Sequence, residues 1–390
     1  MIKIYGANWC PDCQTVKKFF GEHGLSYSWI DIDQSPAAAA EVEKINHGLK
    51  LIPTIIFEDG SHLTEPSLEQ IADKLKTNTS KTHDYHDLVI VGGGPTGLTT
   101  AIYATREGIH TAVVEGKVLG GQTGITDQID NYPGFPEGVP GLKLAEDMTK
   151  QAKKFGTEII SENTIGLRDG PLYKKIIMES GKEITSRVVL IATGSDYKRL
   201  GVAGEAELIG KGVHFCATCD GPFYKNKEIT IIGGGNSALQ EGMFLTRFAS
   251  QIEMIVRAET LSGSQILQDN VRNDPKFKIN YNLETVKLTK RESKIVITAK
   301  NLKTGEIEEH LTDGVFVFIG LKPNTAWLKD SGIQLDDRGF VKTNKSFETN
   351  LEGVFAAGDC RAGATAQIAS AVGEGATAAL MIRYFLKTNG

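Results

Sequence analysis

The chain has 390 residues, of which 40% are hydrophobic and 23% charged, and this is the composition of an ordinary soluble globular protein. Its length exceeds what one hydrophobic core supports, so we expect two or three domains. The formal net charge of −5 argues against nucleic acid or an anionic membrane as the main partner, and no apolar run reaches the length of a membrane span.

The cysteines indicate redox chemistry. Four of the five form two Cys-x-x-Cys pairs, Cys10/Cys13 and Cys216/Cys219. Two thiols at this spacing can close a small disulfide ring and open it again, although half of a zinc site has the same spacing. Such usage is typical of a reducing compartment, and the first residues lack the apolar stretch of a signal peptide, so we expect a cytoplasmic protein. Cys360 has no such partner, and we expect it to be buried and inert.

Histidine spacing gives no sign of a metal site. The eight histidines form neither an HxxxH pattern nor a cluster with cysteines along the sequence. The sequence therefore predicts no metal.

The first 76 residues alternate between strand and helix patterns. A strand at 2–5 leads into Cys10-Pro11-Asp12-Cys13, and the apolar spacing that follows predicts a helix up to Gly24. Cys10 then lies at a helix N-terminus, where free amide groups and the helix dipole stabilise a thiolate. The remaining predicted elements are a strand at 27–33, a helix at 36–45, a strand at 51–57, a short strand after the turn at 58–61, and a helix at 67–76.

This βαβαββα order, with Cys-x-x-Cys after the first strand, resembles the thioredoxin fold. The segment is most similar to glutaredoxins and mycoredoxins, because it is short and begins at the strand that leads into the cysteines. The resemblance implies that Pro53 follows a cis peptide bond and that Trp9, Ile52, Pro53 and Thr54 contact the bound substrate. The glutathione-binding motif of glutaredoxins is altered here at residues 59–66, so the resemblance does not extend to glutathione specificity.

A polar stretch without periodicity, residues 77–87, predicts a linker. An apolar run at 88–91 then indicates a buried parallel strand, and Gly92-x-Gly94-x-x-Gly97 follows it. A helix and a second strand end at Glu115, which lies 21 residues after Gly94, where a dinucleotide-binding fold places the acid that holds a ribose hydroxyl. Together these signals predict a Rossmann-like domain.

A second motif of the same kind occurs further along the chain. A strand at 228–232 leads into Gly233-x-Gly235-x-x-Ala238 and a helix at 239–248. The position 21 residues after Gly235 is Val256, so no acid is predicted for a free ribose hydroxyl. Between the two glycine motifs lies Cys216-Ala217-Thr218-Cys219-Asp220, which we interpret as a redox pair that takes electrons from a bound cofactor.

From residue 87 to the end, the chain resembles the low-molecular-weight thioredoxin reductases. The shared segments are residues 120–122, 131–134, 192–194, 216–220 and 353–359. The resemblance implies an α/β fold class with two Rossmann-like domains, the second inserted in the first, and a homodimer. It divides the chain into a thioredoxin-fold domain at 1–76, a linker at 77–87, an FAD-binding domain at 88–198 and 320–390, and an NAD(P)H-binding domain with the redox pair at 199–319.

The resemblance also assigns cofactor contacts. The residues implied for FAD are Gly92, Gly94, Pro95, Thr96, Gly97, Glu115, Gly121, Gln122, Asn131, Ala192, Thr193, Gly194, Asp359 and Gln367. Those implied for NAD(P)H are Gly233, Gly235, Asn236, Ser237, Ala238 and Arg257. The family has an arginine where Ala366 stands, and three arginines that select NADPH where only Arg257 remains, so NADPH and NADH both stay open.

The expected function is an electron relay. By resemblance, reduced nicotinamide and FAD reduce the Cys216–Cys219 disulfide with Asp220 handling the proton, Cys216 attacks the Cys10–Cys13 disulfide, and Cys10 attacks an external disulfide. That disulfide belongs to a thioredoxin-like protein, a peroxiredoxin or a low-molecular-weight thiol. The alternatives are an NADH-dependent peroxiredoxin reductase, because residues 221–225 and 265–269 also resemble the flavoprotein of alkyl hydroperoxide reductase, and a ferredoxin-fed or sensory flavoprotein.

Overall fold

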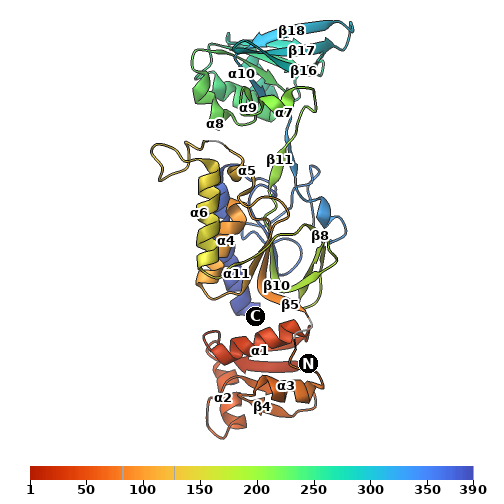
Figure 1. Cartoon of the computed structure of the whole chain (residues 1–390). Coiled ribbons are helices and arrows are strands. Elements are labelled where there is room, and N and C mark those ends of the chain that lie inside the picture. Colours follow the sequence, from red (N-terminus) through yellow and green to blue (C-terminus); the bar gives the residue numbers. More distant parts are fainter. Residues whose placement is uncertain (81–82, 127, 390) are drawn as a thin grey trace. The chain divides into compact units, whose positions relative to one another are not determined.

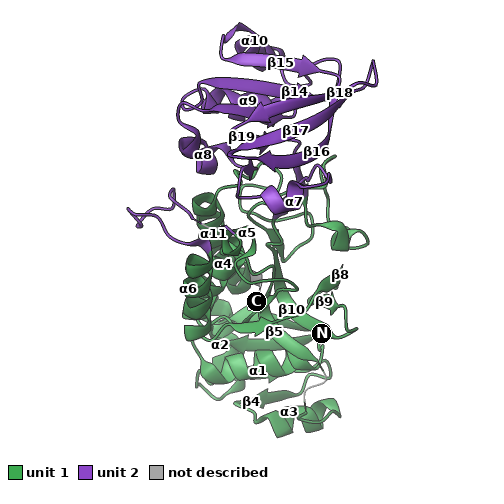
Figure 2. Cartoon of the chain, turned by 45° about the horizontal axis from the view of Figure 1, so that its top comes forward, with its two compact units in different colours: residues 1–125, 142–194, 323–390 green, residues 126–141, 195–322 purple. Residues whose placement is uncertain are grey.

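The computed structural model describes residues 1–80, 83–126 and 128–389 and divides them into two compact units. The first unit contains residues 1–125, 142–194 and 323–390, and the second contains residues 126–141 and 195–322 (Figure 2). In the described part of the chain, no helix is both long enough and apolar enough to cross a membrane.

The N-terminal domain has the expected βαβαββα order. Its strands are β1 (Ile2–Gly6), β2 (Tyr27–Asp31), β3 (Thr54–Ile56) and β4 (His62–Thr64), paired in the order β2-β1-β3-β4. Strands β1 and β2 are parallel, and the other pairs are antiparallel. Its helices are α1 (Pro11–Glu22), α2 (Pro36–Ile45) and α3 (Leu68–Leu75).

Alternation along β1 places helices on both faces of this sheet. Ile4 packs with residues of α1 and α3, whereas Tyr5 packs with residues of α2. Consecutive side chains of a strand point to opposite faces, so two neighbouring residues anchor two layers. This three-layer core fixes where α1 begins, and Cys10 lies at that point.

The first dinucleotide-binding domain is built on a seven-stranded sheet (Figure 1). Its strands are β5 (Asp84–Val91), β6 (Thr111–Val114), β7 (Glu158–Ile160), β8 (Thr164–Arg168), β9 (Lys174–Met178), β10 (Glu183–Ile191) and β21 (Val354–Ala356). The order is β7-β6-β5-β10-β9-β8, and β21 also pairs with β10. Strand β5 begins at Asp84, so residues 84–87, expected in the linker, belong to the strand.

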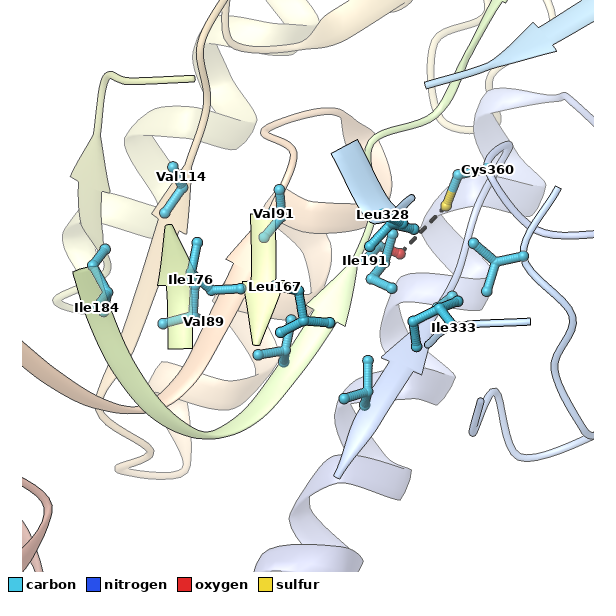
Figure 3. Close-up of a cluster of buried hydrophobic side chains, with 14 of the residues drawn as sticks. Val89, Val91, Val114, Leu167, Ile176, Ile184, Ile191, Leu328, Ile333 and Cys360 are labelled. Carbon is cyan, nitrogen blue, oxygen red and sulfur yellow. Dashed lines mark hydrogen bonds between the residues drawn. The ribbon is translucent and has the colours of Figure 1, made fainter. Parts of the chain in front are cut away.

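Three helices lie together on one side of this sheet: α4 (Pro95–Arg106), α6 (Gly141–Lys154) and α11 (Ile368–Asn389) (Figure 1). A short helix, α5 (Gly121–Gly124), precedes α6. On the sheet, valines and isoleucines of β5 and β10 pack into one apolar cluster that includes Cys360 (Figure 3). Cys360 is fully buried and its thiol donates to the carbonyl oxygen of Ile191 at 3.4 Å, so the expectation of a buried residue is confirmed.

Within the first unit, the N-terminal domain packs against the amino end of β5. The hydroxyl of Tyr173 donates to the Leu25 carbonyl at 3.1 Å, and the His83 amide donates to the Glu22 carbonyl at 2.9 Å. A Cβ on Gly21 would overlap the ring of Tyr85, so α1 approaches β5 as closely as a glycine allows.

The second unit contains the second Rossmann-like sheet. Its parallel strands are β12 (Val213–His214), β13 (Glu228–Ile232), β14 (Gln251–Val256), β15 (Phe277–Tyr281) and β19 (Gly314–Val317), in the order β12-β19-β13-β14-β15. An antiparallel sheet of β16 (Leu283–Arg291), β17 (Lys294–Asn301) and β18 (Ile307–Thr312) accompanies it. The helices are α7 (Glu205–Leu208), α8 (Ala217–Asp220), α9 (Asn236–Leu245) and α10 (Gln265–Asn273).

The chain enters and leaves this inserted part through two short paired strands, β11 (Ser195–Tyr197) and β20 (Leu321–Pro323). The contiguous part of the unit, residues 195–322, is slightly longer than the expected 199–319. Short 3-10 helices at Gly221–Tyr224 and Ala326–Leu328 complete the described elements.

Asn46 links the end of α2 to strands β3 and β4. Its side-chain amide donates to the Thr54 hydroxyl at 3.0 Å and accepts from the Thr64 hydroxyl at 2.6 Å, and the residue is buried. Asn46→Ala is expected to lower the local stability of the N-terminal domain by about 1–3 kcal/mol, because buried partners lose their hydrogen bonds.

Native-state hydrogen exchange of β3 and β4 in the full-length protein measures this effect. A loss of this size accelerates amide exchange there by about 5- to 150-fold. The control is Lys50→Ala, which removes an exposed ion pair with Glu43 and is expected to leave the rates within about twofold. Equal rates in the two variants would show that the Asn46 network contributes nothing to stability.

Candidate redox-active site

Helix α1 positions the first cysteine pair. Cys10 is its N-cap residue, Pro11 occupies the first turn, and the Cys13 amide donates to the Cys10 sulfur at 3.3 Å. A proline fits the first turn because its missing N–H has no intrahelical partner there. Both cysteines are free thiols and almost completely buried. Burial, followed by the hydrogen bond with Cys10, raises the pKa of Cys13 to about 12, so Cys13 stays protonated and Cys10 is left as the nucleophile.

The predicted substrate residues lie around Cys10, but the side chain of Thr54 is buried and does not face a substrate. The Ile52–Pro53 peptide bond is cis, as expected, and the Cys10 thiol lies 4.0 Å from the Ile52 carbonyl oxygen. Trp9 precedes Cys10 and exposes 71% of its surface, while its indole N–H donates to Asp33 at 2.8 Å. Thr54 is fully buried and its hydroxyl donates to the Leu51 carbonyl, so its side chain supports β3 from the inside.

Two residues beside this pair were not predicted. The Lys17 ammonium lies 3.5 Å from the ring centroid of Trp29 and donates to Asn8 at 3.2 Å. Trp29 in turn packs against the cluster that contains Cys10 and Cys13. Burial lowers the pKa of Lys17 to about 8, which allows this group to give or take a proton near neutral pH. Its position four residues after Cys13, on the same helix face, was the available sequence signal.

The second cysteine pair repeats the same construction in the second unit. Cys216 is the N-cap residue of α8, it forms a disulfide with Cys219, and the Cys219 amide donates to its sulfur at 3.1 Å. The two Cα atoms are 5.4 Å apart, within the range of native disulfides. Strand β12 ends at His214, two residues before Cys216.

Asp220 belongs to a hydrogen-bonded chain that sequence reasoning missed. His214 Nδ1 lies 3.2 Å from the Asp220 carboxylate, and His214 Nε2 lies 2.7 Å from the Tyr224 hydroxyl. Burial, followed by the charges of Asp220 and Asp313, raises the pKa of Tyr224 to about 12, so its hydroxyl stays protonated and donates to Nε2. This leaves Nδ1–H to donate to Asp220 and orients that carboxylate beside Cys219. The sequence signal was weak, namely one histidine two residues before Cys216.

The first glycine motif forms a turn with space for a phosphate. Gly92 has φ +112°, and a Cβ there would overlap the Ala192 carbonyl. A Cβ on Gly97 would overlap the Gly92 carbonyl oxygen, which brings α4 close to the turn. At Gly94, the N-cap residue of α4, an added Cβ meets nothing within 4 Å. Open space at a helix N-terminus is what a pyrophosphate requires.

The predicted acids border this turn. Glu115 accepts from the amides of Gly93 at 2.7 Å and Lys117 at 2.8 Å. Asp359 follows β21, and its pKa is raised to about 6, first by burial and then by the charge of Glu374. A half-buried carboxyl whose pKa is raised in this way suits a hydrogen-bonding role toward a cofactor hydroxyl.

The remaining predicted FAD contacts are distributed as follows. Pro95 and Thr96 form the first turn of α4, and Ala192, Thr193 and Gly194 follow the end of β10 beside Gly92. Gly121 and Gln122 begin α5, and an added Cβ on Gly121 would lie 3.5 Å from the Gly94 Cα. Gln367 directly precedes α11. Asn131 lies in the segment 126–141, which belongs to the second unit, so the structure does not group it with the others.

The second glycine motif has the same form. Gly233 has φ +141°, and a Cβ there would overlap the Phe318 carbonyl. Gly235 is the N-cap residue of α9, which therefore begins at Asn236 and not at the expected 239. Asn236 accepts from the Ser264 amide at 2.7 Å, Ser237 is exposed in the first turn, and Ala238 is fully buried.

Arg257 extends from the end of β14. Its side chain is 78% exposed and lies 3.3 Å from the Glu284 carboxylate, a partner that the sequence did not predict. An exposed ion pair of this kind is weak, so a phosphate can compete for the guanidinium.

Comparison with known proteins identifies both parts of the chain. Residues 86–375 match the pyridine nucleotide-disulphide oxidoreductase family, and residues 2–63 match the glutaredoxin family. The chain is 39% identical to a thioredoxin reductase of Bacillus subtilis over 303 residues, which cover 77% of this chain and 95% of that one. It is 38% identical to a thioredoxin reductase of Treponema pallidum over 306 residues, which cover 78% and 98%.

Solved structures give the same result. The thioredoxin reductase of Streptococcus pyogenes matches with a TM-score of 0.74 and 33% identity, over 79% of this chain and all of that one. That of Giardia duodenalis matches with a TM-score of 0.74 and 30% identity, over 78% and 99%. The family implies FAD and a pyridine nucleotide as cofactors. The chain therefore belongs to the pyridine nucleotide-disulphide oxidoreductases, as a flavin-dependent disulfide oxidoreductase similar to thioredoxin reductases that carries an N-terminal glutaredoxin domain.

Proposed function

We propose that the chain is a self-contained disulfide reductase, in which electrons from NADPH or NADH pass to Cys216–Cys219, then to the Cys10–Cys13 pair, and then to an external disulfide. The observation that carries this proposal is the repeated construction of the two pairs, each with its first sulfur at a helix N-terminus and bonded to the amide three residues on. That position favours a thiolate in both pairs. A protein that carried out a single disulfide exchange would need only one such cysteine pair.

The two glycine turns support the entry of electrons. Gly92, Gly94 and Gly97 would hold the FAD pyrophosphate, with Glu115 at a ribose and Asp359 at the chain that leads to the flavin. When bound, FAD converts a two-electron donation by the nicotinamide into reduction of a disulfide. Asp220, oriented by His214 and Tyr224, is placed to give up or accept the proton beside Cys219.

The transfer between pairs is a thiol–disulfide exchange that needs no other reagent. The Cys216 thiolate attacks the Cys10 sulfur of the Cys10–Cys13 disulfide and forms a mixed disulfide with it, and Cys219 then attacks the Cys216 sulfur and releases Cys10. Cys216–Cys219 is oxidised and the Cys10–Cys13 pair leaves as two thiols, so electrons and protons balance. Cys10 next attacks the external disulfide, and Cys13, whose thiol keeps its proton until this step, resolves the product. The neighbouring Lys17, with its lowered pKa, is suited to accept that proton.

The docking of the glutaredoxin domain restricts how this exchange occurs. Helix α1 contacts β5 at its amino end, whereas the FAD loop begins at its carboxyl end. The eight residues of β5 separate these ends by about 26 Å. Exchange within one chain therefore requires movement of the glutaredoxin domain on its tether or movement of the second unit, which carries Cys216, and exchange between chains is the alternative. A tether raises the effective concentration of the acceptor to the order of millimolar in either case.

The acceptor is proposed to be a disulfide that an exposed aromatic residue and a cis-proline loop can recognise. The relatives that match most of the chain are named thioredoxin reductases, and a thioredoxin-like protein disulfide is the corresponding substrate class here. The exposed Trp9 beside Cys10 offers a flat apolar contact of the kind that protein interfaces use.

Asp359→Asn tests the assignment of the FAD site. Because the folded-state pKa of Asp359 is raised above the ordinary carboxyl value to about 6, the cofactor-free wild type loses stability as pH rises through that range. The variant is therefore expected to be more stable than the wild type by about 1–3 kcal/mol at about pH 8, and equal to it below about pH 4. It is also expected to retain less FAD after gel filtration. The exposed Asp330→Asn serves as control, and full FAD retention by Asp359→Asn would argue against the assigned contact.

Arg257→Ala tests the choice of nucleotide. A single exposed guanidinium near a 2′-phosphate is worth about 1 kcal/mol, so kcat/KM for NADPH is expected to fall about fivefold while that for NADH stays the same. Anaerobic reduction of the flavin followed by absorbance measures both. Lys303→Ala is the matched control, since Lys303 is also exposed and pairs with a carboxylate in the same unit. An equal loss with both nucleotides would mean that Arg257 does not select the phosphate.

Cys216→Ser and Cys10→Ser test the relay. Both variants are expected to keep flavin reduction by nucleotide, and each is expected to lose about 100-fold or more of the reduction of an external protein disulfide, because each interrupts one exchange. Cys360→Ala, which removes the lone buried cysteine, is expected to retain activity. A Cys10→Ser enzyme that still reduces the substrate would remove the glutaredoxin domain from the relay.

Mixing the two inactive variants then determines the route. If electrons cross between chains, a mixed dimer regains activity, because one chain supplies Cys216 and the other supplies Cys10. If transfer stays within one chain that undocks its domain, the mixture remains inactive.

A further inference from the structure

A group of metal-ligating side chains lies at the amino edge of the first dinucleotide-binding sheet. His86 is on β5, His110 immediately precedes β6, and Glu158 begins β7. These three strands are parallel neighbours, with Leu88 opposite Thr111 and Ala112 opposite Glu158. The ligand atoms of the three side chains all lie within 4.8 Å of one another. The proposed relay uses the opposite edge of the sheet and leaves this group without a role.

The contacts within the group are those of a site with one buried and two accessible ligands. His86 is 4% exposed and its Nε2 lies 3.0 Å from the Glu158 carboxylate. Its ring stacks on that of His110 with 4.4 Å between centroids and 17° between planes. Among the described residues, His86 Nδ1 has no hydrogen-bond partner. Its Nε2, which faces Glu158, is therefore the nitrogen through which His86 can bind an ion, with the proton of the neutral imidazole on Nδ1.

A cavity of about 180 Å³ adjoins the group, and it is lined by Glu22, Asp84 and Glu158, with Lys18 as its one ammonium group among the described residues. Lys18 lies 3.9 Å from Glu22 across one helical turn, so part of its charge is compensated. Of the carboxylates that line the cavity, Glu158 is the one that contacts His86.

We propose that His86, His110 and Glu158 bind one divalent transition-metal ion of the zinc class. Two imidazole nitrogens and one carboxylate oxygen form a donor set that Zn²⁺ accepts, with water in the fourth position. The ion takes the place of the hydrogen bond between His86 Nε2 and Glu158, and the neutral His86 imidazole then carries its ring proton on Nδ1. The ligands are 24 and 48 residues apart in sequence, which explains why histidine spacing predicted no metal. The site is independent of the proposed function.

Zinc titration of the full-length flavoprotein tests this site. Both Cys-x-x-Cys pairs are first oxidised so that no thiolate competes, and metal is removed with a chelator. Isothermal titration calorimetry with Zn²⁺ is then expected to give one ion per chain. His110→Ala and Glu158→Gln are each expected to weaken binding at least about 100-fold, since each removes one of three protein ligands. The exposed His62→Ala in the glutaredoxin domain is the matched control and is expected to bind as the wild type does.

Two outcomes would overturn the proposal: the absence of a zinc-binding step in the wild type, or binding that His110→Ala leaves unchanged. His110 is exposed, so its replacement is not expected to disturb folding, and retained FAD with an unchanged melting temperature checks this. If Glu158→Gln melts at a lower temperature than the wild type, the result with His110→Ala decides the question alone.

Discussion

Both redox centres depend on a helix that begins at the first cysteine of each pair. At Cys10 and at Cys216 the sulfur takes the place of an N-cap oxygen and accepts the amide of the second cysteine. The same bond stabilises negative charge on the first sulfur and holds the second at disulfide-forming distance. Fold and chemistry are thus linked at one point, since any change that moves the start of α1 or α8 also changes the nucleophile.

The cofactor loops rely on a different constraint, namely the close approach of backbone segments. Gly92 and Gly233 have positive φ, and each touches a carbonyl from a neighbouring strand or loop. No side chain fits there, so the turn stays tight and the following helix points its amide groups at the phosphate. Asp359 is half-buried beside Glu374, whose carboxylate accepts hydrogen bonds from the Gly358 amide and the Arg361 guanidinium. The acid keeps a raised pKa without disrupting the fold.

In the first unit, the glutaredoxin domain and the nucleotide loops use opposite edges of the same sheet. The glutaredoxin domain rests on the amino edge of the sheet, while the nucleotide loops occupy the carboxyl edge. In parallel sheets the carboxyl edge is the usual ligand side, which leaves the amino edge free to receive a second domain. A metal ion at His86, His110 and Glu158 would lie on the amino edge of the sheet, which the glutaredoxin domain occupies.

Local sequence alone determined the elements and the two dithiols. The helix at 36–45 and the strand at 228–232 agree residue for residue with the structure, because Pro36 begins the helix and Gly233 ends the strand. The start of β5 at Asp84 was missed because its first residues are polar, and pairing with β10 overrides that propensity.

Only the tertiary structure decided which distant side chains meet. The chain from Asp220 through His214 to Tyr224 requires β12, α8 and the 3-10 helix after it to pack in one place. The group of His86, His110 and Glu158 requires three parallel strands in register. Sequence periodicity records which face of an element is buried, but contacts between elements depend on sheet order, and no local pattern encodes that order.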